Sequence, residues 1–107
     1  MLIGALAVVS LPLAAVAAES KPGAAELGRK VFTQIAQPSC TICHTLKDAG
    51  AKGTIGPVLD ELKPDAPRVA TAVTKGLGVM PPYEGKLTPE QIKAVAAYVS
   101  GVAGKSK

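Results

Sequence analysis

One short motif, Cys40-Thr41-Ile42-Cys43-His44, constrains this chain more than any other feature, because it holds both cysteines and the only histidine. A structural zinc site needs four ligands, and the chain has no other cysteine or histidine to supply the fourth. A thioredoxin-like dithiol needs a strand leading into the motif within a βαβ unit, and no such pattern is present. A disulfide across two residues would be strained and would leave His44 without a role.

The order Cys-x-x-Cys-His is the attachment signature of c-type haem. Each thiol can add to one vinyl group of the same porphyrin, while the neighbouring imidazole ligates the iron. We therefore predict one haem c, bound covalently through Cys40 and Cys43, with His44 as an axial metal ligand. Met80 is the predicted second metal ligand, because it lies in the Gly- and Pro-rich segment 78–83, where a methionine that only filled a core would be unusual.

The composition also indicates a cofactor. Residues 1 to 18 hold 15 of the about 51 apolar residues, which leaves about 40% apolar residues in the remaining 89. Only three aromatic side chains and no tryptophan are present, so the core is thin for a domain near the lower size limit for independent folding. We expect a bound group to complete the interior.

The N-terminus is predicted to be a cleaved signal peptide, residues 1–18, followed by one domain over residues 19–107. The apolar run ends in the small residues Val16-Ala17-Ala18, and the first charge is Glu19. Export places the protein in the periplasm, with no stable membrane insertion after cleavage. The alternative is an uncleaved anchor, although the run is shorter than a bilayer span and Pro12 interrupts it.

Helical periodicity predicts an all-α domain of about three helices with long loops wrapped round the haem. The first helix runs from Ala24 until Pro38 stops the pattern. The second is capped at Asp65 or Ala66 and ends at Gly76. For the third, Thr88-Pro89-Glu90-Gln91 is a capping box with proline at the first helical position, and Gly101 is the expected end. No strand is predicted.

The sequence resembles a small bacterial class I cytochrome c with one haem, over essentially all of residues 24 to 103. Gly28 and Phe32 resemble the Gly-x-x-x-Phe of the family's first helix, whose glycine lets the last helix cross closely. Tyr98 resembles the aromatic residue that packs at this crossing. The resemblance implies the cytochrome c fold and an electron-transfer function.

Two further segments resemble the haem-binding parts of that family. Met80-Pro81 resembles the distal ligand and its following proline. The sequence Gly56-Pro57-x-Leu59 resembles the segment whose proline carbonyl accepts a hydrogen bond from the proximal histidine, which implies that Pro57 and Leu59 are cofactor-binding residues. The chain departs from the family in having no tryptophan to hold a haem propionate and in its short second helix, which would leave the haem edge unusually exposed.

We predict an electron carrier, and not an enzyme, that exchanges single electrons with redox protein partners, namely a donor and an acceptor such as a dehydrogenase or a terminal oxidase. The formal charge of +4 comes from scattered lysines and two arginines, which fits an acidic protein partner better than nucleic acid. The alternatives are a haem enzyme or gas sensor with an open distal position and a fixed haem subunit of a larger oxidoreductase. The lysines expected around the haem, as a docking face for the partner, are Lys47, Lys52, Lys75 and Lys86.

Overall fold

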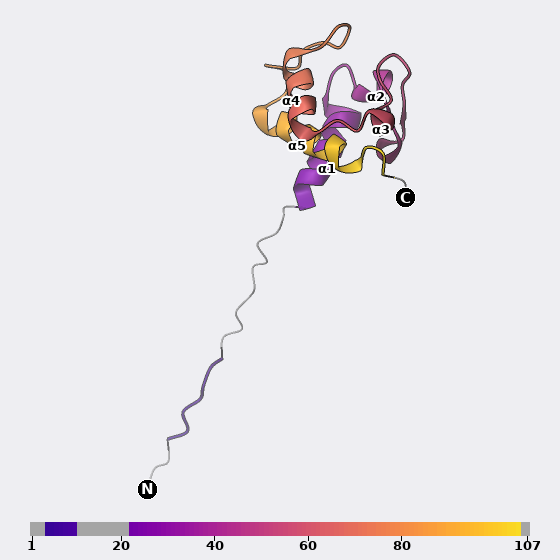
Figure 1. Ribbon diagram of the computed structural model, residues 1–107. Helices are drawn as coiled ribbons and strands as arrows, with labels where there is room; N and C mark the ends of the chain where they lie inside the picture. Colours follow the sequence, from indigo (N-terminus) through magenta and orange to yellow (C-terminus); the bar gives the residue numbers. More distant parts are fainter. Residues whose placement is uncertain (1–3, 11–21, 106–107) are drawn as a thin grey trace.

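The computed structural model describes residues 4–10 and 22–105. Helices are its main regular structure, which confirms the predicted all-α class (Figure 1). In chain order the helical elements are α1 (Pro22–Lys30), the π-helical turn η1 (Val31–Ile35), α2 (Cys40–Cys43), the 3-10 turn η2 (Lys47–Ala49), α3 (Leu59–Leu62), α4 (Ala66–Lys75) and α5 (Pro89–Val102).

Two short strands correct the expectation of a domain without strands. β1 (Thr45–Leu46) and β2 (Ala51–Lys52) pair antiparallel, with Leu46 opposite Ala51. Each strand has only two residues, so no alternating pattern of useful length exists for the sequence to display. Leu46 and Ala51 are both buried, and the pair ties the segment that follows the cysteine motif to the core.

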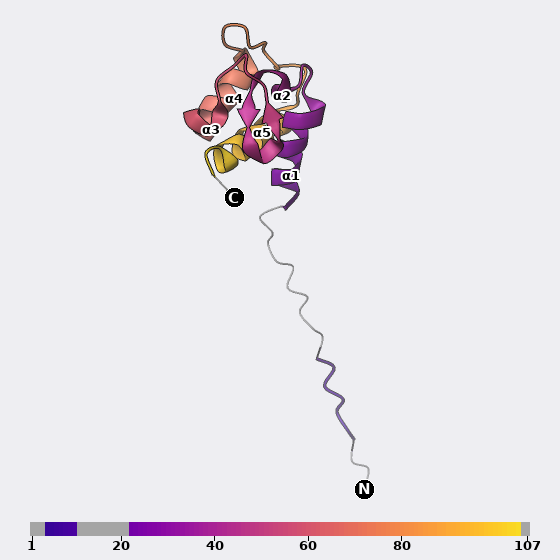
Figure 2. The same ribbon diagram turned by 90° about the vertical axis from the view of Figure 1, so that its right-hand side faces the viewer.

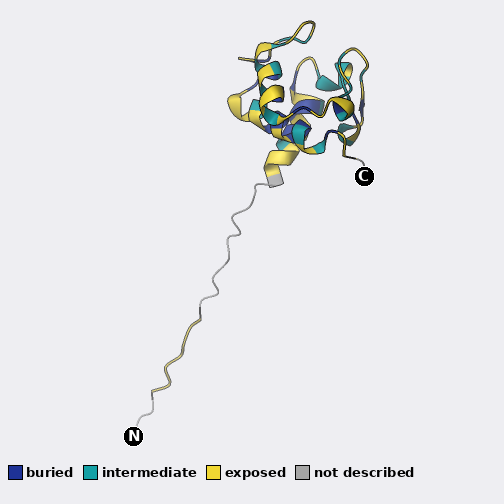
Figure 3. Ribbon diagram, in the orientation of Figure 1, coloured by how far each residue is buried: buried dark blue, intermediate teal, exposed yellow. Residues whose placement is uncertain are grey.

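The core lies where α1 and η1 cross α5, and it contains the fully buried side chains of Val31, Phe32 and Val95 (Figures 1 and 3). The rings of Phe32 and Tyr98 are 6.2 Å apart between centroids and tilted by 60°, a favourable arrangement for two aromatic side chains. The Tyr98 hydroxyl donates to Asp48 Oδ2 at 2.6 Å. Burial, with the Asp48 carboxylate, raises the pKa of this phenol above its ordinary value.

Gly28 is the residue that allows the two helices to approach. A Cβ atom at this position would overlap the Ala94 carbonyl oxygen and the Tyr98 Cβ atom. The predicted crossing of the first and last helices at Gly28, Phe32 and Tyr98 is therefore present in the fold.

Gly28→Ala should lower the free energy of unfolding by up to about 2 kcal/mol. Forcing extra volume into a packed contact costs about 1–3 kcal/mol, and the gain of alanine over glycine in a helix returns about 1 kcal/mol of it. Gly23→Ala is the matched control, because Gly23 also lies in α1 and has no atom within 4 Å of its would-be Cβ. Guanidinium unfolding of both holoproteins measures the difference; equal midpoints would contradict a tight crossing.

The N-caps of α4 and α5 are those predicted from the sequence, but the C-terminal end of α5 is not. Asp65 caps α4 by accepting from Arg68 N at 2.8 Å, and the capping box predicted for α5 is present. The expected end at Gly101 is wrong, because α5 continues through it to Val102. The helix stops where Gly104, with φ of 74°, takes the left-handed conformation typical of the residue after a helix, and its N–H donates to Asp60 Oδ1 at 2.9 Å.

The predicted signal peptide lies largely outside the described residues. Of residues 1–18 the structure describes only 4–10, which are exposed and have neither helix nor strand. Within the described ranges no helix has the length and apolar character needed to span a bilayer.

After α4 the chain forms a loop that projects from the rest of the molecule, as the two perpendicular views of Figures 1 and 2 show.

Candidate functional site

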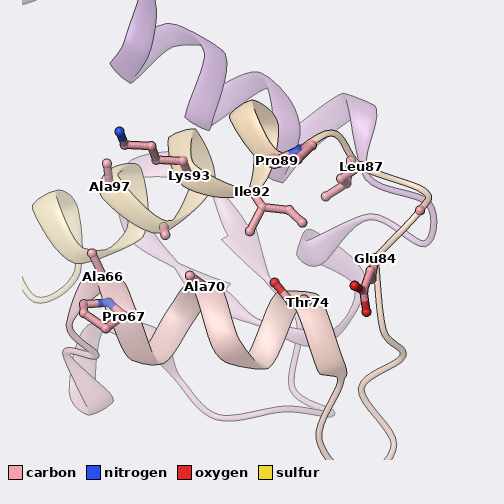
Figure 4. A pocket seen from close by; sticks show the side chains of 12 residues that line it. Ala66, Pro67, Ala70, Thr74, Glu84, Leu87, Pro89, Ile92, Lys93 and Ala97 are labelled. Atoms are coloured by element: carbon pink, nitrogen blue, oxygen red, sulfur yellow. The ribbon is translucent and has the colours of Figure 1, made fainter.

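Two cavities in the described part of the chain differ in their lining, and the second of them contains the residues singled out from the sequence. The first, of about 630 Å³, is an apolar groove between α4 and α5 (Figure 4). Ala66, Ala70, Ile92 and Ala97 are among its lining residues, which include no thiol, imidazole or thioether. The second, of about 400 Å³, falls in the size range of cofactor sites. Its wall brings together all six predicted site residues, namely Cys40, Cys43, His44, Pro57, Leu59 and Met80.

The short helix α2 carries both thiols of this second cavity. Ser39 caps the helix by accepting from Thr41 N at 3.4 Å, and the His44 N–H closes its other end on the Cys40 carbonyl at 3.0 Å. Residues three apart lie on the same side of a helix, so Cys40 and Cys43 both face the cavity. Both are free thiols rather than a disulfide. Burial, helped by the neighbouring Cys43, raises the pKa of the Cys40 thiol to about 11.

The His44 imidazole is oriented by a carbonyl from the following loop. Its Nδ1 lies 2.8 Å from the Pro57 oxygen. A carbonyl can only accept, so the proton is on Nδ1 and the Nε2 lone pair is available to a metal. The hydrogen bond that the resemblance implied between these two residues is present in the structure.

Gly56 was noted in the sequence only as the start of the Gly56-Pro57-x-Leu59 segment, and it was not predicted to be a site residue. A Cβ atom there would lie 2.7 Å from His44 Cε1 and 3.0 Å from Nδ1, so only glycine lets the loop pass this close to the imidazole ring. The Gly56 N–H also donates to the Cys43 carbonyl at 2.6 Å. The signal available in the sequence was its place directly before Pro57.

Met80 enters the same cavity from the loop after α4. Leu77 and Met80 exchange two backbone hydrogen bonds of 3.0 Å across a tight turn, in which Gly78 has φ of 59°. The Met80 side chain is half-buried and packs against the core. The fold therefore brings a thioether to the cavity that already holds two thiols and an imidazole with a free Nε2.

Comparison with known proteins places the chain among c-type cytochromes. The family profile described as "Cytochrome C oxidase, cbb3-type, subunit III" matches residues 23–99. Cytochrome c6 of Nostoc sp. (strain PCC 7120) is 36% identical over 84 residues, which cover 71% of this chain and 68% of the relative. Cytochrome c6 of Microcystis aeruginosa is 35% identical over 75 residues, covering 63% and 88%. The crystal structure of the c-type cytochrome SorU from Sinorhizobium meliloti has a TM-score of 0.76 and 59% sequence identity, covering 79% of this chain and 97% of that chain. The chain belongs to the class I cytochrome c family.

This cytochrome is thus an electron-transfer protein, and its cofactor is one haem c attached through Cys40 and Cys43. The residues of the second cavity fit that group, since the two thiols lie on one side of α2 beside an imidazole whose Nε2 is free. Haem supplies one-electron chemistry, its iron alternating between the ferrous and ferric states. The zinc, dithiol and disulfide interpretations of the motif are no longer needed.

The surface around the cytochrome's cavity is more apolar than the sequence suggested. Three strongly exposed side chains belong to its lining, Ile55, Leu77 and Val79, with exposed fractions of 65%, 73% and 87%. In the described part of the chain, Arg68 is the one lysine or arginine among the lining residues. Of the four lysines expected around the haem, Lys47, Lys52, Lys75 and Lys86, all are exposed and none lines the cavity.

Tyr83 is a second residue that the sequence reasoning missed. It is 4% exposed, lines the cavity, and donates its hydroxyl to the Pro38 carbonyl at 2.6 Å. Burial, with the nearby Cys40 and Cys43 thiols, raises the pKa of Tyr83 to about 12. The phenol therefore remains a hydrogen-bond donor at neutral pH. An aromatic residue in a segment otherwise rich in Gly and Pro was the available signal.

Proposed function

We propose that this cytochrome is a periplasmic electron carrier, a one-electron shuttle that has His44 and Met80 as axial ligands of the haem iron. The observation that carries the proposal is that Met80 lines the same cavity as Cys40, Cys43 and His44. Histidine and methionine are a known axial pair in cytochromes c, and the thioether raises the reduction potential. With both axial positions taken by side chains, the protein carries electrons and catalyses no reaction on a small molecule.

The remaining wall residues hold and tune the group. The hydrogen bond to Pro57 keeps the His44 tautomer and ring orientation constant and raises the basicity of the ligating nitrogen. Leu59, which is 8% exposed, supplies an apolar contact surface beside it. Arg68 is the side chain suited to a haem propionate, because a guanidinium pairs with a carboxylate, and the chain has no tryptophan for that task.

Electron exchange takes place at the apolar mouth of the cavity, with the lysines acting at longer range. Ile55, Leu77 and Val79 are exposed there and offer a surface that a redox partner can cover. The net charge of +4 steers an acidic partner, such as a dehydrogenase or a terminal oxidase, toward the protein.

Lys75→Glu should slow association with an acidic redox partner several-fold at low salt, because Lys75 ends α4 two residues before the exposed Leu77. The difference from wild type should shrink as ionic strength rises and screens the charges. Lys93→Glu is the matched control, since Lys93 lines the other groove and makes the same charge change. Stopped-flow electron transfer at several salt concentrations measures the association rates of both variants. Equal slowing by the two variants would show that Lys75 has no special role in partner binding.

Intact mass and an optical spectrum of protein from the periplasmic fraction test the proposal as a whole. We expect a mass that equals residues 19–107 plus one haem, and a weak far-red sulfur-to-iron charge-transfer band in the oxidised protein. Retention of residues 1–18 would contradict export by a cleaved signal. Absence of the band would contradict methionine ligation and favour the open distal position of a haem enzyme or gas sensor.

A second candidate is a haem subunit held within a larger oxidoreductase, which the description of the matching family as an oxidase subunit favours. The electron-transfer chemistry would be unchanged. Size-exclusion chromatography of the native extract separates the two: a free shuttle elutes at the mass of a small single chain, whereas a subunit elutes with its complex.

A further inference from the structure

Tyr83 joins three parts of the haem cavity. Its hydroxyl reaches the Pro38 carbonyl, two residues before Cys40, and its backbone N–H donates to the Val73 carbonyl of α4 at 2.8 Å. Tyr83 also follows Met80 by three residues in the chain. Through its side chain and its backbone, this one buried residue therefore links the start of the haem-attachment segment, the end of α4 and the loop that carries the methionine.

The link between Met80 and Tyr83 is stiff. Only Pro81 and Pro82 separate the two residues, and each proline ring holds its own φ near −65°. On the other side of Met80, the turn that contains Gly78 is closed by two backbone hydrogen bonds between Leu77 and Met80. Movement of Met80 is therefore transmitted through the two prolines to Tyr83.

We infer that Tyr83 is a positioning residue for the distal ligand. The hydrogen bond from its phenol to the Pro38 carbonyl, called the clamp below, holds residues 80–83 in place, so that Met80 leaves the iron only when this bond breaks. This inference rests on the proposed ligation by Met80. Phenylalanine would fill the same space but could not donate to the Pro38 carbonyl. The hydroxyl thus makes displacement of the methionine by an outside ligand costlier.

Binding of imidazole to the ferric holoprotein measures the clamp, because imidazole must displace the methionine first. Imidazole binds only to the state in which Met80 has left the iron. While that state is rare, the apparent affinity for imidazole rises in proportion to its population. Tyr83→Phe should therefore bind imidazole about ten-fold more tightly, the factor expected for loss of one buried hydrogen bond. The far-red band of Tyr83→Phe without imidazole should still be present.

Tyr98→Phe is the matched control. It removes the other phenol of the chain, which also donates at 2.6 Å to a residue far along the sequence, Asp48, but Tyr98 does not line the haem cavity. Both variants should lower the free energy of unfolding, and only Tyr83→Phe should change imidazole affinity. Equal imidazole affinities in the two variants, with the far-red band present in wild type, would overturn the clamp alone. Absence of the band in wild type would overturn the clamp together with the ligation by Met80.

Hydrogen exchange of the wild-type holoprotein gives a test that does not depend on folding of the variant. If Met80 and Tyr83 move together, saturating imidazole should speed exchange of the Tyr83 amide, which is bonded to Val73, by at least about ten-fold. Amides in the middle of α5 should exchange at the same rate with and without imidazole. A Tyr83 amide that stays equally protected with and without imidazole would mean that the methionine leaves by another movement, and the inference would fail.

Discussion

Replacing Met80 by alanine should lower the reduction potential of the holoprotein by on the order of a tenth of a volt, within the about 0.8 V range that axial ligands span. The physical reason is that a thioether stabilises ferrous iron, so its loss favours the ferric state. The far-red charge-transfer band should vanish at the same time. Potentiometric titration and the optical spectrum of the oxidised protein are the two measurements.

Val79→Ala is the matched control for this change. Val79 precedes Met80 in the same loop and lines the same cavity, but its side chain is 87% exposed. We expect its potential and its band to stay close to those of wild type. If Met80→Ala kept the band and the potential, the sixth position of the iron would belong to another group, and the shuttle mechanism proposed for this cytochrome would be wrong.

The double variant Cys40→Ala/Cys43→Ala should lose most of its helix content. Without the thioether bonds haem is not retained, and the walls of a cavity of about 400 Å³ lose their packing partner. The apolar side chains that line this open cavity would then face water, which is a large loss for a domain whose whole stability is typically about 5–15 kcal/mol. Circular dichroism and thermal unfolding, compared with the wild-type holoprotein, measure the loss.

The single variant Cys40→Ala is the control, because it keeps one attachment point and the full set of core residues. We expect its helix content to lie near that of wild type whenever haem is retained. A double variant that is free of haem but helical, with a cooperative thermal transition, would refute the view that the cofactor completes the core.

The features that the sequence predicted correctly depend on neighbours in the chain. The caps at Asp65 and Thr88 are set within three residues, and the spacing of Cys40 and Cys43 on one helical turn is equally local. The two-residue strands were not predicted, and the end of α5 was predicted incorrectly. The strands are too short to leave a pattern, and the end of α5 is set at Gly104, where the N–H bonds to a carboxylate 44 residues away.

Within the site, the sequence alone determined the chemistry of attachment, because the Cys40, Cys43 and His44 spacing names one cofactor. It also indicated Met80, through a methionine in a segment unsuited to a helix. Only the tertiary structure decided what surrounds that chemistry, namely the close approach of Gly56 to the imidazole, the bond from Tyr83 to Pro38 and the apolar rather than lysine-lined mouth. The physical reason is range: a hydrogen bond across 45 residues costs chain entropy and needs the whole core to place its ends, and no local pattern in the sequence records it.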